Sequence, residues 1–143
     1  MLISTKGRYA LRVLVDMAEH QAEGYIPLKE IADRQEISEK YLESIVKELV
    51  KNNVVTGVRG KGGGYRLRRP PEQINLGDIL SYMEGSLSPV ACLEDGAGPC
   101  ARAAVCRTLD FWRGLNDAIT KYTSAYFLSD LMRTGQPGND YII

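Results

Sequence analysis

The sequence predicts a mainly α-helical fold with a small β wing, and three observations lead to this fold class. Apolar residues recur at steps of three and four along most of the 143 residues, as they do in amphipathic helices. Residues 54–69 instead alternate around a run of glycines, which is typical of a two-stranded hairpin. Two helical stretches separated by a tight turn come directly before this hairpin. This order predicts a winged helix-turn-helix domain, and a long dimerisation helix is expected in the second half of the chain.

The predicted domain begins behind Ser4 or Thr5, either of which can cap a first helix that ends near residues 20–24. Pro27 opens a short second helix with the sequence LKEIADRQ. A third helix starts at Ser38, because Ser is a preferred N-cap and an apolar stripe at helical spacing follows it. That stripe, which we expect to face the core, consists of Leu42, Ile45, Val46 and Leu49.

The hairpin concentrates positive charge. The chain has a formal net charge of zero, yet residues 51–69 contain six basic side chains and no acidic one. Such a segment suits the phosphates of a nucleic acid. A nucleotide-binding phosphate loop fits less well, because Lys61 is not followed by Ser or Thr and a strand pattern comes next. We expect the consecutive glycines to let the tip approach a sugar-phosphate backbone while Arg59 reaches into a narrow minor groove.

The outward face of the third helix offers hydrogen-bond donors, a carboxylate and positive charge. A helix that reads base edges in the major groove needs these groups. An ordinary solvated helix face is the alternative explanation. The candidate DNA-binding residues of the helix and the hairpin are Ser38, Lys40, Tyr41, Glu43, Arg59, Lys61 and Gly62.

Composition excludes several classes of protein. The apolar fraction of 44% and the charged fraction of 25% are those of a soluble globular protein. No apolar run approaches the roughly 20 residues that span a bilayer, and the first residues lack a signal-peptide core. We therefore expect a cytoplasmic protein without a membrane partner. No nucleophile and base stand at a recognisable spacing, so an enzyme is not expected.

The second half of the chain predicts a dimer. Asn75 can cap a fourth helix, and a long helix from about Thr108 to Tyr126 carries a stripe of apolar and aromatic side chains. A winged domain alone has little surface to cover this stripe. An antiparallel helix from a second copy would cover it, giving a two-fold homodimer that suits a palindromic operator in double-stranded DNA. The alternative is that the helix packs back on its own domain.

These patterns divide the chain into two parts. We expect residues 1–72 to form the winged helix-turn-helix DNA-binding domain. Residues 73–143 hold the fourth helix, a cysteine-bearing loop, the dimerisation helix and a short tail whose apolar ending could dock elsewhere.

The loop between the fourth helix and the long helix, residues 85–107, is too long for a plain connection, which indicates a function. It holds all three cysteines, Cys92, Cys100 and Cys106, and an odd number in a cytoplasmic chain favours metal or redox chemistry over a structural disulfide. The paired-cysteine spacing of structural zinc sites is absent, so an iron-sulfur cluster is the better prediction. Such a cluster needs a fourth ligand. Free thiols or a thiol-based redox sensor are the alternative.

Several segments resemble the IscR-type family of bacterial transcription regulators, which includes nitric-oxide-sensing and cysteine-metabolism (CymR-like) members. The segments are ISTKGRYALR, ISEKYLESIVKELVKNNVV, VRGKGGGYRL and the three-cysteine loop followed by DFWRGL. The resemblance covers nearly the whole chain. It implies a dimeric winged-helix regulator, with a [2Fe-2S] cluster on Cys92, Cys100 and Cys106 in the iron-sulfur-sensing branch. It also implies that Arg59 enters the minor groove and that Glu43 reads a base.

Two positions depart from the family pattern. The iron-sulfur branch has a histidine three residues after the third cysteine, where this chain has Leu109. The nitric-oxide branch has an acidic residue near the start of the first helix, where this chain has Arg8. The fourth ligand is therefore open, and candidates are Asp110, Glu94, Asp95 and Glu43.

The hypothesis at this point is a homodimeric regulator whose operator affinity changes when the loop gains or loses its cluster. A cysteine-metabolism repressor, controlled by redox thiols or by a partner protein, is the alternative within regulation. A metal or cluster carrier that does not bind DNA is the alternative of another class.

Overall fold

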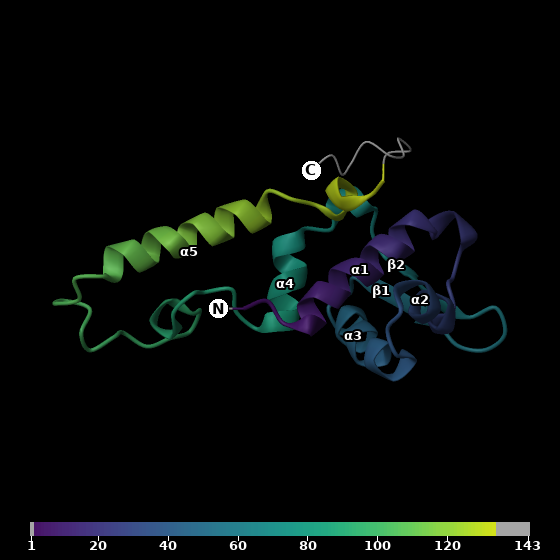
Figure 1. Cartoon of the computed structure of the whole chain (residues 1–143), viewed down its shortest axis with the longest axis horizontal. Helices are drawn as coiled ribbons and strands as arrows, with labels where there is room; N and C mark the ends of the chain where they lie inside the picture. The colour runs from purple at the N-terminus through teal and green to yellow at the C-terminus, as the bar shows by residue number, and fades with distance from the viewer. Residues whose placement is uncertain (1, 134–143) are drawn as a thin grey trace.

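The computed structural model describes residues 2–133 and shows helices arranged around one two-stranded sheet (Figure 1). This architecture confirms the predicted mainly α fold with a β wing. The α-helices are α1 (Thr5–Glu19), α2 (Leu28–Gln35), α3 (Glu39–Lys51), α4 (Leu76–Glu84) and α5 (Leu109–Ser124). The strands are β1 (Val55–Val58) and β2 (Gly64–Leu67). Short 3-10 turns are η1 (Gln21–Glu23), η2 (Pro71–Gln73), η3 (Ala91–Leu93) and η4 (Leu128–Leu131).

Three predicted helix starts are confirmed by their caps. The Ser4 side chain accepts a hydrogen bond from the Gly7 N–H, and the Ser38 side chain accepts one from the Tyr41 N–H. Asn75 accepts from two N–H groups at the start of α4. A side-chain oxygen at the N-cap satisfies N–H groups that the helix itself cannot bond, so these residues fix where each helix begins.

The wing is an antiparallel hairpin whose register pairs Val55 with Leu67 and Val58 with Gly64. A strand packed on a core alternates between buried and exposed residues, but the residues of this hairpin do not. Val54 and Val55 are both buried, whereas Val58 is 46% exposed, because the hairpin leaves the core and projects from it. The hairpin therefore has an anchored base and a solvated tip (Figure 1).

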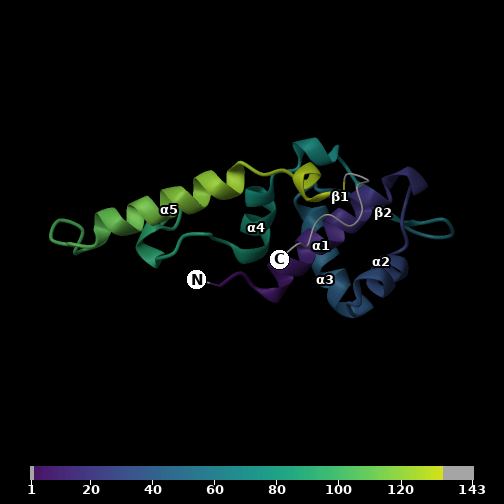
Figure 2. The same ribbon diagram turned by 45° about the horizontal axis from the view of Figure 1, so that its top comes forward.

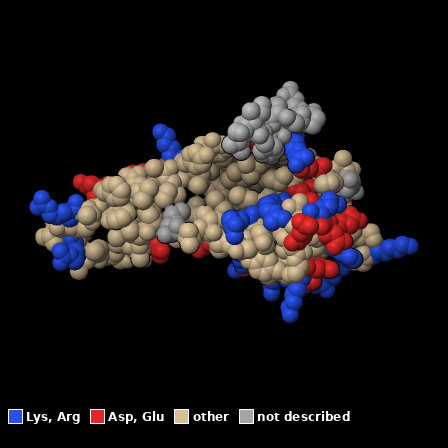
Figure 3. Space-filling model, viewed as in Figure 1, with Lys and Arg blue, Asp and Glu red and all other residues tan. Residues whose placement is uncertain are grey.

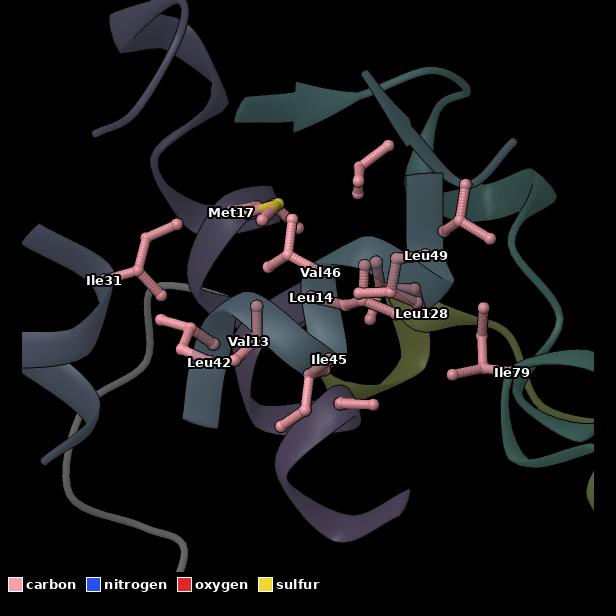
Figure 4. Close-up of a cluster of buried hydrophobic side chains, with 14 of the residues drawn as sticks. Val13, Leu14, Met17, Ile31, Leu42, Ile45, Val46, Leu49, Ile79 and Leu128 are labelled. Carbon is pink, nitrogen blue, oxygen red and sulfur yellow. The ribbon is translucent and has the colours of Figure 1, made fainter. Parts of the chain in front are cut away.

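One hydrophobic core lies between α1, α3 and α4. Figure 4 shows Val13 and Met17 of α1 facing Leu42 and Val46 of α3. The core also takes in residues beyond the wing, which include Ile74, Ile79 and Leu128. The packing thus joins the start of the second half of the chain to the winged domain.

Leu128 returns the chain to this core after α5. Its N–H donates to the Ile74 carbonyl over 2.8 Å, and Asn75 pairs with Phe127 in an isolated bridge. Leu128 begins the 3-10 turn η4. The predicted docking of the apolar tail falls on residues outside the described range.

Helix α5 stands apart from the rest of the fold. It extends away from the winged domain in both ribbon views (Figures 1 and 2) and contacts α4 at one end. None of its sixteen residues is buried. Among the described residues, no helix is long and apolar enough to cross a membrane.

Candidate nucleic-acid interface and cysteine loop

Helix α3 divides its side chains between core and solvent. Leu42, Ile45, Val46 and Leu49 are at most 1% exposed, as the stripe predicted. All four predicted contact residues of this helix and its cap, Ser38, Lys40, Tyr41 and Glu43, are exposed. The helix therefore presents donors and one carboxylate to solvent along its N-terminal half.

Tyr41 is held in place on this exposed face. Its ring packs edge-on against the ring of Tyr9 in α1, with centroids 5.9 Å apart. Its carbonyl accepts a hydrogen bond from the Ser44 hydroxyl over 2.7 Å. A ring fixed by an aromatic neighbour loses less freedom when it meets a ligand.

The wing tip is built from glycines and two exposed cations. Gly60 and Gly62 have φ values of 94° and 77°, in the left-handed region that favours glycine. The Gly63 N–H closes the turn on the Gly60 carbonyl over 2.9 Å. Arg59 and Lys61 project into solvent on this turn. The tip is narrow and positively charged, as the sequence predicted.

Two other wing arginines are engaged within the protein. The Arg66 guanidinium lies 4.6 Å from the centre of the Tyr25 ring, and Arg68 donates to Asn53 over 3.0 Å. Both remain exposed. Figure 3 shows Lys and Arg side chains projecting from the winged end of the molecule, with acidic side chains between them on the viewed face.

Sequence reasoning missed an anchor at the base of the wing. Ile26 and Tyr65 exchange both backbone hydrogen bonds, at 2.9 and 2.8 Å, so the residue before Pro27 extends the sheet by one bridge. A Cβ at Gly64 would overlap the Ile26 carbonyl, so this close approach requires glycine. The available signal was Pro27 itself, since a residue before proline favours an extended backbone.

Sequence reasoning also missed Asp16, a buried carboxylate of α1. It is 3% exposed and accepts two hydrogen bonds from Arg34, at 2.7 and 2.9 Å, and one from Gln35 at 2.9 Å. Burial raises the pKa of Asp16, but the hydrogen bonds from Arg34 and Gln35 and nearby positive charge outweigh it and leave the pKa below the ordinary 3.8. The only earlier hint was an acidic residue inside an apolar helix.

The cysteine loop is mostly solvated. Cys92 and Cys100 are exposed and Cys106 is partly exposed, and all three thiols are free. Ser88 ties the beginning of the loop to α5 through a 2.9 Å hydrogen bond with Asn116. The predicted long loop is confirmed, with one short turn, η3, at Cys92.

Cys106 lies just before α5 and has the most defined surroundings of the three. Its Sγ is 3.5 Å from the Thr108 hydroxyl, which also accepts a hydrogen bond from the Trp112 indole over 3.2 Å. Hydrogen bonds from the Thr108 side chain and from the backbone of Thr108 and Leu109 lower the pKa of the Cys106 thiol below its ordinary 9.0. Thiolate is the form that binds metals and reacts with oxidants.

The donor chemistry of the loop fits an iron-sulfur cluster, because three accessible soft thiols lie in one unpacked segment. Within residues 2–133, however, no three His, Cys, Asp or Glu side chains lie close enough together to hold a metal ion. Asp110, one of the candidate fourth ligands, is 3.7 Å from Arg113 in an exposed ion pair. Binding would therefore require the loop to close around the thiols.

Helix α5 carries the predicted stripe on its solvent side. Of the predicted stripe, Tyr122 is 66% exposed and Leu115 and Tyr126 are 37% and 38% exposed, whereas Leu109, Trp112 and Ile119 are half-buried. Phe111, which the predicted stripe did not include, is 67% exposed. An apolar groove of about 470 Å³ lies beside this stripe, between the N-terminal segment, α4 and α5. Packing of α5 against α4 covers the stripe only in part, because no residue of α5 is buried.

Known proteins are similar to this chain in both sequence and fold. The profile of the Rrf2 family, described as an iron-dependent transcriptional regulator, matches residues 3–134. The chain belongs to the Rrf2 family. It is 38% identical to the HTH-type transcriptional regulator IscR of Aliivibrio salmonicida over 132 residues, which cover 92% of this chain and 77% of that protein. Such Rrf2 proteins are DNA-binding transcriptional regulators and not enzymes, so this chain is one too.

Two solved structures resemble the fold. CymR, the global cysteine regulator of B. subtilis, aligns with a TM-score of 0.73 and 38% identity, covering 92% of this chain and 95% of CymR. IscR of T. potens aligns with a TM-score of 0.71 and 34% identity, covering 92% of this chain and 85% of that structure. Membership of a regulator family does not support the alternative of a cluster carrier that never binds DNA.

Proposed function

We propose that this Rrf2 protein is a homodimeric, sequence-specific regulator that reads a palindromic operator and responds to the state of its cysteine loop. Residues 1–72 would bind DNA, and residues 73–143 would pair the two copies and sense the signal. The observation that carries the proposal is the exposed face of α3 beside a glycine-tipped wing with exposed Arg59 and Lys61. A DNA groove accepts a helix of this kind, and the phosphates beside it accept the cations.

Helix α3 is proposed to read the major groove with its N-terminal half. Glu43 can accept a hydrogen bond from a cytosine amino group, and Tyr41 can pack against base edges or a sugar. Lys40 and the capping Ser38, both exposed, would meet phosphates beside such a helix. Replacing Glu43 should therefore change sequence preference, while replacing Lys40 should weaken binding to all sequences alike.

The wing is proposed to meet the minor groove beside this site. Arg59 suits a narrow groove because the negative potential is enhanced there. Lys61 would pair with a phosphate, and Gly62, whose φ is positive, would keep the tip close to the sugar-phosphate backbone.

Binding to a duplex tests this proposal directly. The probe is a palindromic duplex selected by the protein itself from a random-sequence pool, with affinity measured at fixed salt. We expect Arg59→Ala to weaken this affinity by about 1–3 kcal/mol. Lys121→Ala on α5 is the matched control and should bind as the unchanged protein does. Unaltered affinity of Arg59→Ala would refute the proposed role of the wing.

Dimerisation through α5 follows from its uncovered stripe. Phe111, Leu115 and Tyr122 recur on one side of a helix with no buried residue. An antiparallel copy of the same helix offers a matching stripe, and a two-fold axis would place two α3 helices over the two halves of a palindrome.

The cysteine loop is proposed to hold a [2Fe-2S] cluster through Cys92, Cys100 and Cys106. When bound, the cluster supplies a one-electron redox group that responds to oxidants and to iron supply. The chain contributes three thiols, one of which has a lowered pKa, and a loop with few packing contacts to resist rearrangement. The fourth ligand is left open, because Leu109 stands at the position of the family's histidine and its side chain has no atom that can bind iron.

Protein purified without oxygen tests the cluster. We expect visible absorption with two irons and two sulfides per chain, about the stoichiometry of the cluster. Cys92→Ser, Cys100→Ser and Cys106→Ser should each reduce iron content, whereas the buried core and the duplex affinity of the iron-free protein should stay unchanged. A colourless protein that cannot be reconstituted would exclude this cofactor.

A second candidate, a repressor with redox-active thiols, is favoured by two observations. The three thiols do not converge on a metal site in the described chain, and the fold is also similar to a regulator of cysteine metabolism. In that case oxidation of the iron-free protein should change its affinity for the duplex. Mass spectrometry identifies which thiols have been oxidised. Reduction should restore the affinity.

A further inference from the structure

Helix α1 contacts both α4, which leads into the cysteine loop, and α3. It also contacts α2 and β2, and its first residues meet Glu84 of α4. Figure 1 shows it crossing the winged domain from the foot of α4 toward the wing. Its fifteen residues make a rod about 22 Å long.

The first end of α1 is bound to the residue that precedes the cysteine loop. Glu84, the last residue of α4, accepts hydrogen bonds from the Ser4 N–H over 2.9 Å and from the Ser4 hydroxyl over 2.8 Å. Ser4 is itself the N-cap of α1. A Cβ at Gly7 would overlap Glu84 Oε1, so the carboxylate lies directly against the helix. The loop begins at the next residue, Gly85.

The middle of α1 cannot deform independently of its ends. Ala10, Val13 and Leu14 are fully buried, and Met17 and Ala18 are at most 2% exposed. Close-packed cores resist local distortion, so a displacement at Ser4 moves the helix as a unit.

The second half of α1 holds the turn that leads into α3. Gln35, the last residue of α2, donates to Asp16 over 2.9 Å and accepts from the Arg12 Nε over 3.3 Å. The backbone carbonyl of Gln35 accepts a further hydrogen bond from Arg12. Glu36 then turns the chain in the left-handed conformation, and Ser38 caps α3 two residues later.

A third contact joins α1 to the exposed face of α3. Arg12 lies 4.9 Å from the centre of the Tyr9 ring, and Tyr9 packs edge-on against Tyr41. The same helix thus touches Glu84 at the loop and Tyr41 at the proposed DNA contact.

We propose that α1 transmits the state of the cysteine loop to α3, with Glu84 as the positioning residue at the loop end. This inference rests on the proposed function, because it needs a loop that changes state and a helix that binds DNA. The dimer helix would not be needed for this step. Helix α4 also contacts α3 directly, so a route that bypasses α1 exists and the experiment must separate the two.

The experiment compares the iron-free protein with its thiols free and with the same thiols alkylated by N-ethylmaleimide. One readout is hydrogen exchange at the amides of α1 and of residues 38–43, and the other is affinity for the selected duplex. We expect alkylation to change both in the unchanged protein, with affinity shifting about tenfold, a typical coupling between sites. Glu84→Ala should reduce that shift to less than about twofold while alkylation still changes exchange within the loop.

Three further variants sharpen the result. Glu84→Gln keeps an oxygen that can accept from Ser4, so most of the coupling should persist. Gly7→Ala keeps Glu84 but displaces its carboxylate, and coupling should fall although alanine favours a helix. Asp78→Ala removes an exposed carboxylate of the same helix and should leave coupling unchanged.

The outcomes separate the inference from the proposed function. Suppose that alkylation of the loop thiols changes hydrogen exchange at residues 38–43 only when Glu84 is present. This result supports the inference even if no duplex binds. If no duplex binds, the proposed function alone fails. Full coupling in Glu84→Ala would overturn the inference and point to the direct contact between α4 and α3. Duplex binding with no response at α1 or α3 to alkylation would also overturn it, with DNA binding intact.

Discussion

Of the buried apolar residues in the described chain, all except Leu128 lie between Ala10 and Ile79, whereas α5 buries none of its sixteen residues. The winged region, residues 2–84, therefore carries its own core and caps. The C-terminal region, residues 85–133, consists of an exposed loop, a helix with a solvated apolar stripe and the turn η4, whose Leu128 returns to the core of the first region. The first region has the packing of an independently stable domain, and the second has surfaces that a second copy or a cofactor would cover.

This difference separates stability from regulation. Core residues of the winged region decide whether the protein folds. In the proposed function, the loop and α5 of the C-terminal region pair the two copies and sense the signal, and few contacts within the chain hold these two segments in one arrangement.

The largest expected effect contrasts two leucines. Leu49→Ala removes a fully buried side chain and should lower the free energy of unfolding by about 2–5 kcal/mol. Leu115→Ala truncates a side chain that is 37% exposed and should lower it by less than about 1 kcal/mol in the monomer. Urea denaturation at low protein concentration measures both. Equal losses would show that the two regions do not differ in this way.

The next effect concerns the stripe on α5. Tyr122→Lys should weaken dimerisation by about 2–4 kcal/mol, because a charge placed inside an apolar interface loses its hydration without a partner. By helical periodicity, Asp117 lies on the other side of the helix. Asp117→Lys therefore serves as the control for added positive charge. Sedimentation gives the dimer fraction. Dimers that survive Tyr122→Lys would place the interface elsewhere.

A smaller effect concerns the buried carboxylate of the winged region. Asp16→Asn should lower the free energy of unfolding at pH 7 by about 1–3 kcal/mol, since Arg34 is partly solvated and its pairing is screened. The folded-state pKa of Asp16 is below its ordinary 3.8, so this stability is present above that pH and is lost as pH falls through the folded-state value.

Acid unfolding measures this contribution. The unchanged protein should lose stability below about pH 4 more steeply than Asp16→Asn does, because only the carboxylate takes up a proton on unfolding there. Parallel curves would mean that other carboxylates dominate the acid response.

The smallest effect concerns one cation at the wing tip. Lys61→Ala should weaken duplex binding by less than about 1 kcal/mol at moderate salt, and it should reduce the slope of log affinity against log salt by about 0.9, the contribution of one phosphate contact. Sequence preference should not change. Lys121→Ala on α5 should leave the slope as it was, and a slope unaffected by Lys61→Ala would place that side chain away from the phosphates.

Much of the winged region could be predicted from the sequence because its signals are local. Helical spacing identified the buried face of α3, and Ser4, Ser38 and Asn75 marked helix starts through side-chain chemistry that acts within three residues. The glycine run predicted the wing tip because only glycine adopts positive φ without strain. The proposed DNA contacts and cluster cysteines remain predictions of the same local kind.

The sequence by itself determined the helices, the hairpin, the cysteine loop and the apolar stripe of α5, because each depends on neighbours along the chain. Only the tertiary structure decided which distant groups meet. It paired Ile26 with Tyr65, buried Asp16 between Arg34 and Gln35, joined Glu84 to Ser4 and left the stripe of α5 in solvent. These contacts join residues 18 to 80 positions apart, and no periodicity or spacing encodes them, because they depend on how whole helices pack.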